Sequence, residues 1–304
     1  MQGSGINVPG PMEVSGRIRQ LFCDVPALPW GRLLMIFVIV GLMSSRAVAA
    51  ELVDMELMTY AEVAVALQAG RTTVLIYNGG TEQRGPHAVL GGHSLIARRA
   101  SVEIARQLGN ALVAPVLPFS IAGDHLNPKW PGTVNLPGPL FSAINEAVVD
   151  SMVVNGFKNI VLMGDHGGGQ EELRDLSQRL DKKYASRGTR LYFCGDVYGK
   201  TIDDVDVWLK AHGLPPGAHG DIHDTSVLMY LGGDTYVRTD KLVAGDPLLE
   251  PGQSANRSKD LVDNGVIGDP RRSTREMGKL FFDIKVRNAV EQIRSLLSGE
   301  PRQK

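Results

Sequence analysis

Residues 160–169 read Ile-Val-Leu-Met-Gly-Asp-His-Gly-Gly-Gly, a short apolar run that leads directly into a polar, glycine-rich turn. The run from Ile160 to Met163 has the length and composition of a buried strand, and Gly164 ends it. The next residues, 170–183, have the pattern of a charged helix. A strand followed by a turn and a helix is the repeating unit of parallel sheets.

The same unit recurs along residues 51–304. We expect strands at 74–77, 111–117, 160–163 and 190–194, and helices at 93–108, 138–154, 170–183, 203–211, 224–230 and 273–297. Residues 246–272, rich in Gly, Pro, Asn and Asp, are expected to form a long loop. The alternation predicts an α/β domain with a mostly parallel sheet and helices on both of its faces.

The first 50 residues differ from the rest. Arg32 precedes an apolar run at 33–42, and small residues end the stretch at Ala49 and Ala50. This pattern predicts a signal peptide within an N-terminal extension at 1–50, and therefore a secreted or periplasmic domain at 51–304 that is free of the membrane after cleavage. An uncleaved membrane anchor is the alternative.

Charge and cysteine content narrow the function further. The chain of 304 residues carries a formal net charge of -1 and no Lys/Arg-rich run, which gives no reason to expect a nucleic-acid partner. Of its two cysteines, Cys23 precedes the expected cleavage site. The mature domain would keep Cys194 alone, which we expect to be a small buried side chain rather than a nucleophile.

Six of the seven histidines lie in four short polar clusters, and each cluster lies beside an expected strand or helix. The clusters span residues 81–93, 123–127, 164–169 and 219–226. Ligands of open parallel sheets bind beyond the carboxyl ends of the strands, where these clusters are expected to meet. Histidines gathered with carboxylates predict a metal site.

Each cluster also has a simpler interpretation. A histidine after a strand is often only solvated, and the glycines of 164–169 would suit a phosphate-binding turn. That turn lacks the G-x-G-x-x-G pattern and the Gly-Lys-Ser/Thr ending of known phosphate loops. Asp224, or alternatively Asp221, would serve as the N-cap of the helix that follows.

In their order along the chain, these clusters resemble the motifs of the creatininase family of metal-dependent amidohydrolases. The similar segments are Thr81-Glu82-Gln83-x-Gly85-Pro86-His87, His125 with Pro131-Gly132-Thr133, residues 156–168, His219-Gly220 with Asp224-Thr225-Ser226, and residues 265–270. The resemblance implies a three-layer αβα sandwich, a centre of one or two divalent ions, and hydrolysis of an amide or cyclic amide in a small molecule. It also suggests a homo-oligomer.

Carried over by position, the resemblance makes Glu82 and His166 metal ligands, Asp224 the acidic residue of a Glu-Thr-Ser motif, and His219 a residue that transfers protons. Two positions depart from the family pattern. Arg84 stands where the family has a metal-binding histidine, and His93 stands where it has an aspartate that bridges two metals. Arginine cannot ligate a metal, and a neutral imidazole has a single free lone pair.

We therefore expect one divalent ion held by Glu82, His93, His166 and Asp224. Zinc suits this shell, and manganese or iron would also fit. Arg84 would replace the lost cation and bind a substrate carboxylate or an oxyanion. His125 and Trp130 would line the substrate pocket.

The expected reaction is attack of an activated water on a C–N bond. The main alternative is a degenerate relative that binds a metal or a small ligand without turnover, and a lyase or isomerase is a lesser one. No Gly-x-Ser-x-Gly motif of a serine hydrolase occurs in the sequence.

Overall fold

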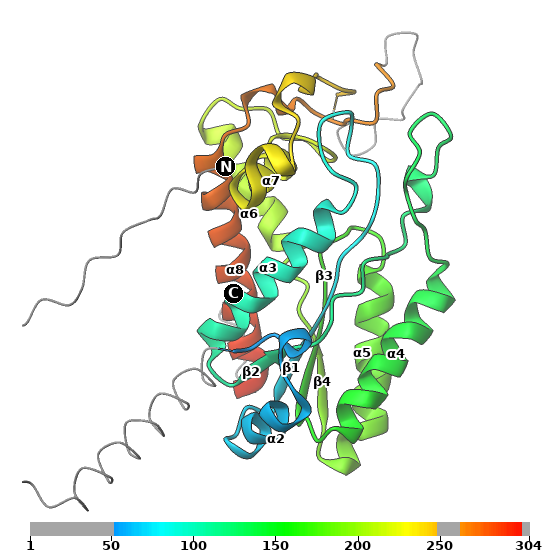
Figure 1. Ribbon diagram of the computed structural model, residues 1–304, viewed down its shortest axis with the longest axis vertical. Helices are drawn as coiled ribbons and strands as arrows, with labels where there is room; N and C mark the ends of the chain where they lie inside the picture. The colour runs from blue at the N-terminus through cyan, green and yellow to red at the C-terminus, as the bar shows by residue number, and fades with distance from the viewer. Residues whose placement is uncertain (1–51, 248–261, 300–304) are drawn as a thin grey trace, which may run out of the picture. The chain divides into compact units, whose positions relative to one another are not determined.

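The computed structural model describes residues 52–247 and 262–299 (Figure 1). Within them, four parallel strands form one sheet with the order β2-β1-β3-β4. The strands are β1 (Thr73–Asn78), β2 (Ala111–Val113), β3 (Asn159–Gly164) and β4 (Arg190–Phe193). The central pair β1 and β3 is in register from Thr73 opposite Asn159 to Asn78 opposite Gly164. The predicted parallel sheet is confirmed.

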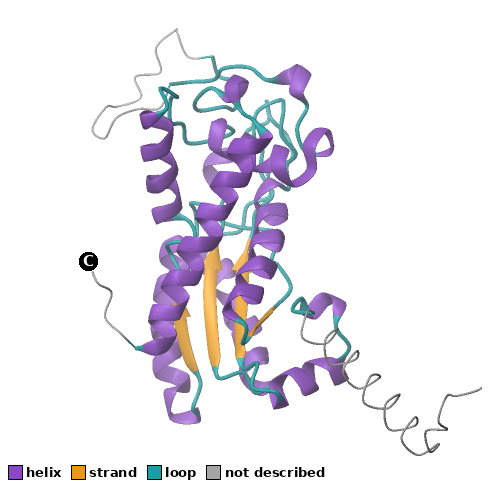
Figure 2. Ribbon diagram, turned by 90° about the vertical axis from the view of Figure 1, so that its left-hand side faces the viewer, coloured by secondary structure: helices purple, strands orange, loops and turns teal. Residues whose placement is uncertain are grey.

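Alternate residues of the central strands face two separate cores. Leu75, Tyr77 and Val161 belong to the core under α3 (Gly92–Leu108), α6 (Gly199–Ala211), α7 (Ile222–Gly232) and α8 (Arg275–Ser298). Val74 and Ile160 belong to the core under α2 (Tyr60–Gln68), α4 (Gly138–Val154) and α5 (Gln170–Tyr184). Figures 1 and 2 show the helices on both sides of the sheet, so the three-layer αβα sandwich is confirmed.

Most element boundaries agree with the expected ones, and the exceptions have local causes. Strand β2 ends at Val113 instead of residue 117, because Pro115 follows and lacks the N–H that a ladder requires. Helix α7 begins at Ile222 because Asp221 is its N-cap, accepting from the Asp224 backbone N–H at 3.0 Å. Helix α2, which begins with a capping box at Thr59 and Glu62, was not expected from the sequence.

Only the two ends of the loop expected at 246–272 fall within the described residues. Ile267 pairs with His219 and with Asp246, which ties the end of the loop to the segment before α7. The signal-peptide interpretation of residues 1–50 lies outside the described residues. Within the described part, no helix has the length and apolarity needed to cross a bilayer. Cys194 is fully buried, as predicted.

Candidate metal centre

The candidate site lies at the carboxyl ends of β1 and β3. Glu82 follows β1, and His166 follows β3 with only Asp165 between them. His93 is the second residue of α3, His125 ends the short helix η2 (Gly123–His125), and His219 precedes α7. In Figure 2 the connecting loops gather at this end of the strands, which brings segments far apart in sequence to one place.

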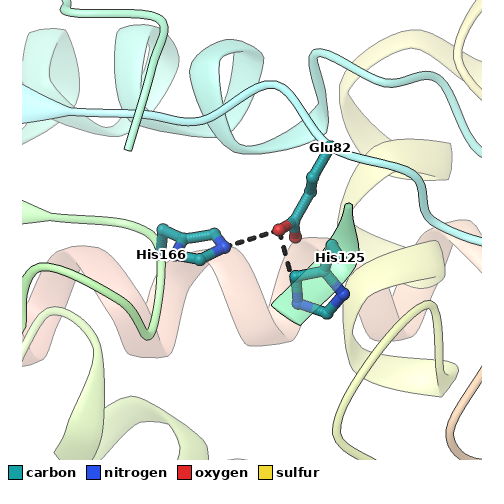
Figure 3. A group of neighbouring side chains, drawn as sticks. All are labelled: Glu82, His125 and His166. Carbon is teal, nitrogen blue, oxygen red and sulfur yellow. Dashed lines mark hydrogen bonds and ion pairs between the residues drawn. The ribbon is translucent and has the colours of Figure 1, made fainter. Parts of the chain in front are cut away.

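Glu82, His125 and His166 form one compact group, which we call the ligand cluster. Glu82 Oε2 lies 2.5 Å from His166 Nε2 and 3.5 Å from His125 Nε2. One ligand atom from each residue lies within 4.8 Å of the other two, and Figure 3 shows both rings directed at the carboxylate. One carboxylate and two imidazoles are the donors that Zn²⁺ and Mn²⁺ accept, so the set fits a divalent ion.

The other oxygen of Glu82 faces a different set of groups. Oε1 lies 2.9 Å from His93 Nε2, 3.6 Å from an Arg84 terminal nitrogen and 3.7 Å from His219 Nδ1. The second terminal nitrogen of Arg84 lies 2.7 Å from Asp224 Oδ2. Only 1% of the Arg84 side chain is exposed, so its positive charge is placed among buried acceptors.

The buried carboxylate of Asp165 contacts His93 and is paired with the buried amine of Lys285. Asp165 accepts from His93 Nδ1 at 2.9 Å, from Lys285 Nζ at 2.8 Å and from the Tyr77 hydroxyl at 2.9 Å. Lys285 also donates to the backbone oxygen of Val197 at 3.0 Å. We call Arg84, His93, Asp165, Asp224 and Lys285 the ion-pair network.

Asp165, Tyr77 and Lys285 were not among the residues predicted from the sequence, although two of them left a signal. Asp165 is adjacent to His166 in the quoted turn, and Lys285 stands one turn after Phe281 on the apolar face of the helix expected at 273–297. A charge at a core-facing helix position indicates a buried partner.

The charges of the network determine which groups are ionised. Burial alone would raise the pKa of Glu82, but hydrogen bonds with His166 and His93 and the charge of Arg84 hold it well below its usual range. Burial also opposes ionisation of Asp165, yet Lys285 and His93 lower its pKa to about 2. Burial works against the charge of Arg84, but Asp224 and Glu82 raise its pKa further. Both carboxylates and the guanidinium are therefore charged at neutral pH.

His219 is a neutral imidazole that presents a free nitrogen lone pair to the site. Its shortest contact joins Nε2 to the backbone oxygen of Gln83 at 2.6 Å, and because a carbonyl only accepts, Nε2 carries the hydrogen. Nδ1, on the side of Glu82, then keeps a free lone pair. Burial, followed by the charge of Arg84, lowers the pKa of His219 to about 4. The ring stacks on His125 with a centroid distance of 4.2 Å.

The ligand cluster and the network line a cavity of about 500 Å³, which His219 also lines. Of the residues predicted from the sequence, Glu82, Arg84, His93, His125, His166, His219 and Asp224 all line it. Trp130 does not belong to that lining among the described residues. Asp224 lies beside Arg84, outside the ligand cluster, and also accepts from the Gly220 backbone N–H at 2.9 Å.

Comparison with known proteins agrees with this architecture. Residues 56–293 match the family model described as creatinine amidohydrolase. The chain belongs to the creatininase family. Members of this family are metal-dependent amidohydrolases or peptidases, which agrees with the resemblance seen in the sequence.

Individual creatininase-family relatives show the range of named activities. The chain is 28% identical over 237 residues to a mycofactocin precursor peptide peptidase of Mycolicibacterium smegmatis, covering 73% of this chain and 84% of that protein. A peptidase of the same name from Mycobacterium ulcerans is 26% identical over 233 residues, with the same coverage.

Solved creatininase structures share the fold. A creatininase variant described as Zn-Zn type has a TM-score of 0.66 and 23% identity, covering 80% of this chain and 98% of that one. A manganese creatininase has a TM-score of 0.66, 22% identity and the same coverage. At this level of identity, the similarity shows the creatininase fold, and the chemistry has to be argued from the residues present in this chain.

Proposed function

We propose that this protein is a metal-dependent hydrolase that cleaves an amide C–N bond, with a divalent ion held by Glu82, His125 and His166. The observation that carries the proposal is the convergence of these three donors beside a cavity at the carboxyl edge of the sheet. Two structural relatives are described as a Zn-Zn type and a manganese form, which supports zinc or manganese as the ion.

The residues of this chain divide the work of such a reaction. A divalent ion, when bound, supplies Lewis acidity to the cavity. His219 is neutral at neutral pH, because its pKa is about 4, and its free Nδ1 faces the same carboxylate as the two ligand histidines. It is placed to take a proton from the attacking water and to return it to the leaving nitrogen.

The substrate is proposed at the level of the bond that breaks. The relatives named as peptidases act on a peptide, and those named as creatinine amidohydrolases act on a cyclic amide. Both reactions add water across a C–N bond of an acyl group. We therefore propose that this chain acts on either a short peptide or a small amide.

The test compares wild type with His166→Ala on a panel of short peptides, linear amides and lactams. We expect turnover that a chelator abolishes and added Zn²⁺ or Mn²⁺ restores. His166→Ala should lose the ion and on the order of 10³-fold in kcat/KM, since Lewis acidity contributes several kcal/mol. The matched control, His212→Ala, removes an exposed histidine that stacks on Trp208 and should change neither.

The alternative is a relative that binds without turnover. A metal-loaded wild type that binds members of the panel, measured by calorimetry, but releases no product from any of them would favour it over the hydrolase.

A further inference from the structure

We infer that the guanidinium of Arg84 takes the place of a second cation, so that the centre holds a single divalent ion. The inference rests on the proposed function, because it concerns the same site. The sequence led to the expectation that Arg84 replaces a lost cation, and the side-chain contacts of Arg84 now give that role a geometry.

The first support is the geometry of the donors around Arg84. A second ion beside Glu82 would need Oε1 of that residue, the oxygen that faces away from the ligand cluster, together with donors such as Asp224 and His93. The guanidinium already engages all of them. It lies 3.6 Å from Glu82 Oε1 and 2.7 Å from Asp224 Oδ2, and it contacts both ring nitrogens of His93, with Nδ1 at 2.9 Å.

The second support is the balance of charge. Glu82, Asp165 and Asp224 contribute three negative charges, and Arg84 and Lys285 contribute two positive ones. The ring nitrogens of His93 also face Glu82 and Asp165, so His93 adds a further positive charge when it is protonated. The carboxylates are therefore already largely balanced. A second divalent ion would leave an excess of positive charge among these side chains, and an excess of buried charge is costly.

The third support is the fit of the arginine side chain. A Cβ added to Gly92 would lie 3.0 Å from Arg84 Cδ and 3.1 Å from Arg84 Nε. The absence of a side chain at the start of α3 therefore leaves the room that the stem of Arg84 occupies. Helix α3 also carries His93, so the segment that leaves room for the arginine supplies its imidazole partner as well.

Metal stoichiometry tests the inference without recourse to activity. Full-length protein, stripped with chelator and titrated with Zn²⁺ and separately with Mn²⁺, is analysed by calorimetry and by metal content per chain. We expect about one tightly bound ion in wild type. Arg84→Met removes the guanidinium while keeping a similar stem, and it should gain a second ion and a larger rise in Tm on addition of Zn²⁺.

Arg98→Met is the control, because Arg98 is a half-exposed residue on the same helix as His93 and pairs with Glu56 outside the site. It should bind one ion, as wild type does. Two ions in wild type would overturn the inference and leave the proposed function standing, whereas no ion would overturn the proposed function itself. A folded Arg84→Met protein that still binds one ion would also overturn the inference. If that variant does not fold, the wild-type count decides alone.

Discussion

The two oxygens of Glu82 face two groups of residues that differ in charge. Oε2 faces His125 and His166, which supply lone pairs and no fixed charge of their own. Oε1 faces the ion-pair network, in which Arg84 and Lys285 neutralise Asp224 and Asp165. The carboxylate of Glu82 thus belongs to two groups. The ligand cluster has no cation of its own, whereas the ion-pair network contains the cations of Arg84 and Lys285.

This difference indicates how a family site can change without losing its fold. A side chain that binds a metal must be deprotonated, and it competes with water for the ion. A buried arginine, in contrast, is always charged and brings its hydrogen-bond donors with it. The cost is that each buried cation depends on a particular carboxylate. Variants that remove single partners separate the two sides of Glu82.

The largest effect on stability is expected from Lys285→Met. The substitution leaves Asp165 buried without its amine, and removing one partner of a buried ion pair costs about 3–5 kcal/mol. Urea unfolding of the metal-free protein measures the loss. The control is Lys279→Met on the same helix, where an exposed lysine pairs with Asp283 and should matter little. Equal losses in the two variants would mean that Lys285 does not balance a buried charge.

Much of this arrangement could be predicted from the sequence. The strands at 74–77 and 160–163 were predictable because they are short apolar runs closed by glycine or asparagine. Glu82, His93 and His166 could be placed together because parallel strands deliver their following residues to one edge of the sheet.

The contacts inside the site could not be predicted in the same way. Lys285 lies 120 residues from Asp165 in sequence, and only the packing of α8 on the sheet brings them together. The same holds for Asp224, which the sequence offered as a ligand and which in the structure lies 2.7 Å from Arg84. Which of several neighbouring donors meets a given partner depends on side-chain positions that the spacing of motifs does not fix.

Acidification should destabilise the metal-free protein before its carboxylates titrate. Burial lowers the pKa values of His87, His219 and His223 to about 4, below the unfolded value near 6.5. Below pH 6.5 the unfolded chain takes up protons that the folded chain does not, so stability is lost as the pH falls towards 4. Between pH 7 and 5.5 each histidine should cost about 1 kcal/mol, or roughly 3 kcal/mol for the three.

Urea unfolding at the two pH values, with chelator present, measures this loss. His87→Gln should remove about a third of it, because His87 is one of the three histidines, contacts Thr225 and lies outside the ligand cluster. A free energy of unfolding that is constant from pH 7 to 5.5 would contradict the assignment of the three histidines as buried neutral groups.

The smallest expected effect concerns the metal affinity of the ligand cluster. A Cβ added to Gly168 would lie 1.9 Å from the backbone oxygen of Ile121 and 3.2 Å from His166 Nδ1. Backbone cannot yield as a flexible side chain does, so Gly168→Ala should move the segment that carries His125 away from His166. We expect metal affinity to fall about 10- to 100-fold, as it does when the support of a ligand is disturbed, with the ion-pair network left intact. Gly199→Ala is the matched control, because a Cβ there meets nothing within 4 Å, and its affinity should equal that of wild type. If Gly168→Ala binds Zn²⁺ as tightly as the control does, then the spacing of His125 and His166 does not set the affinity. The metal ligands would then have to be sought among the residues that face Oε1 of Glu82.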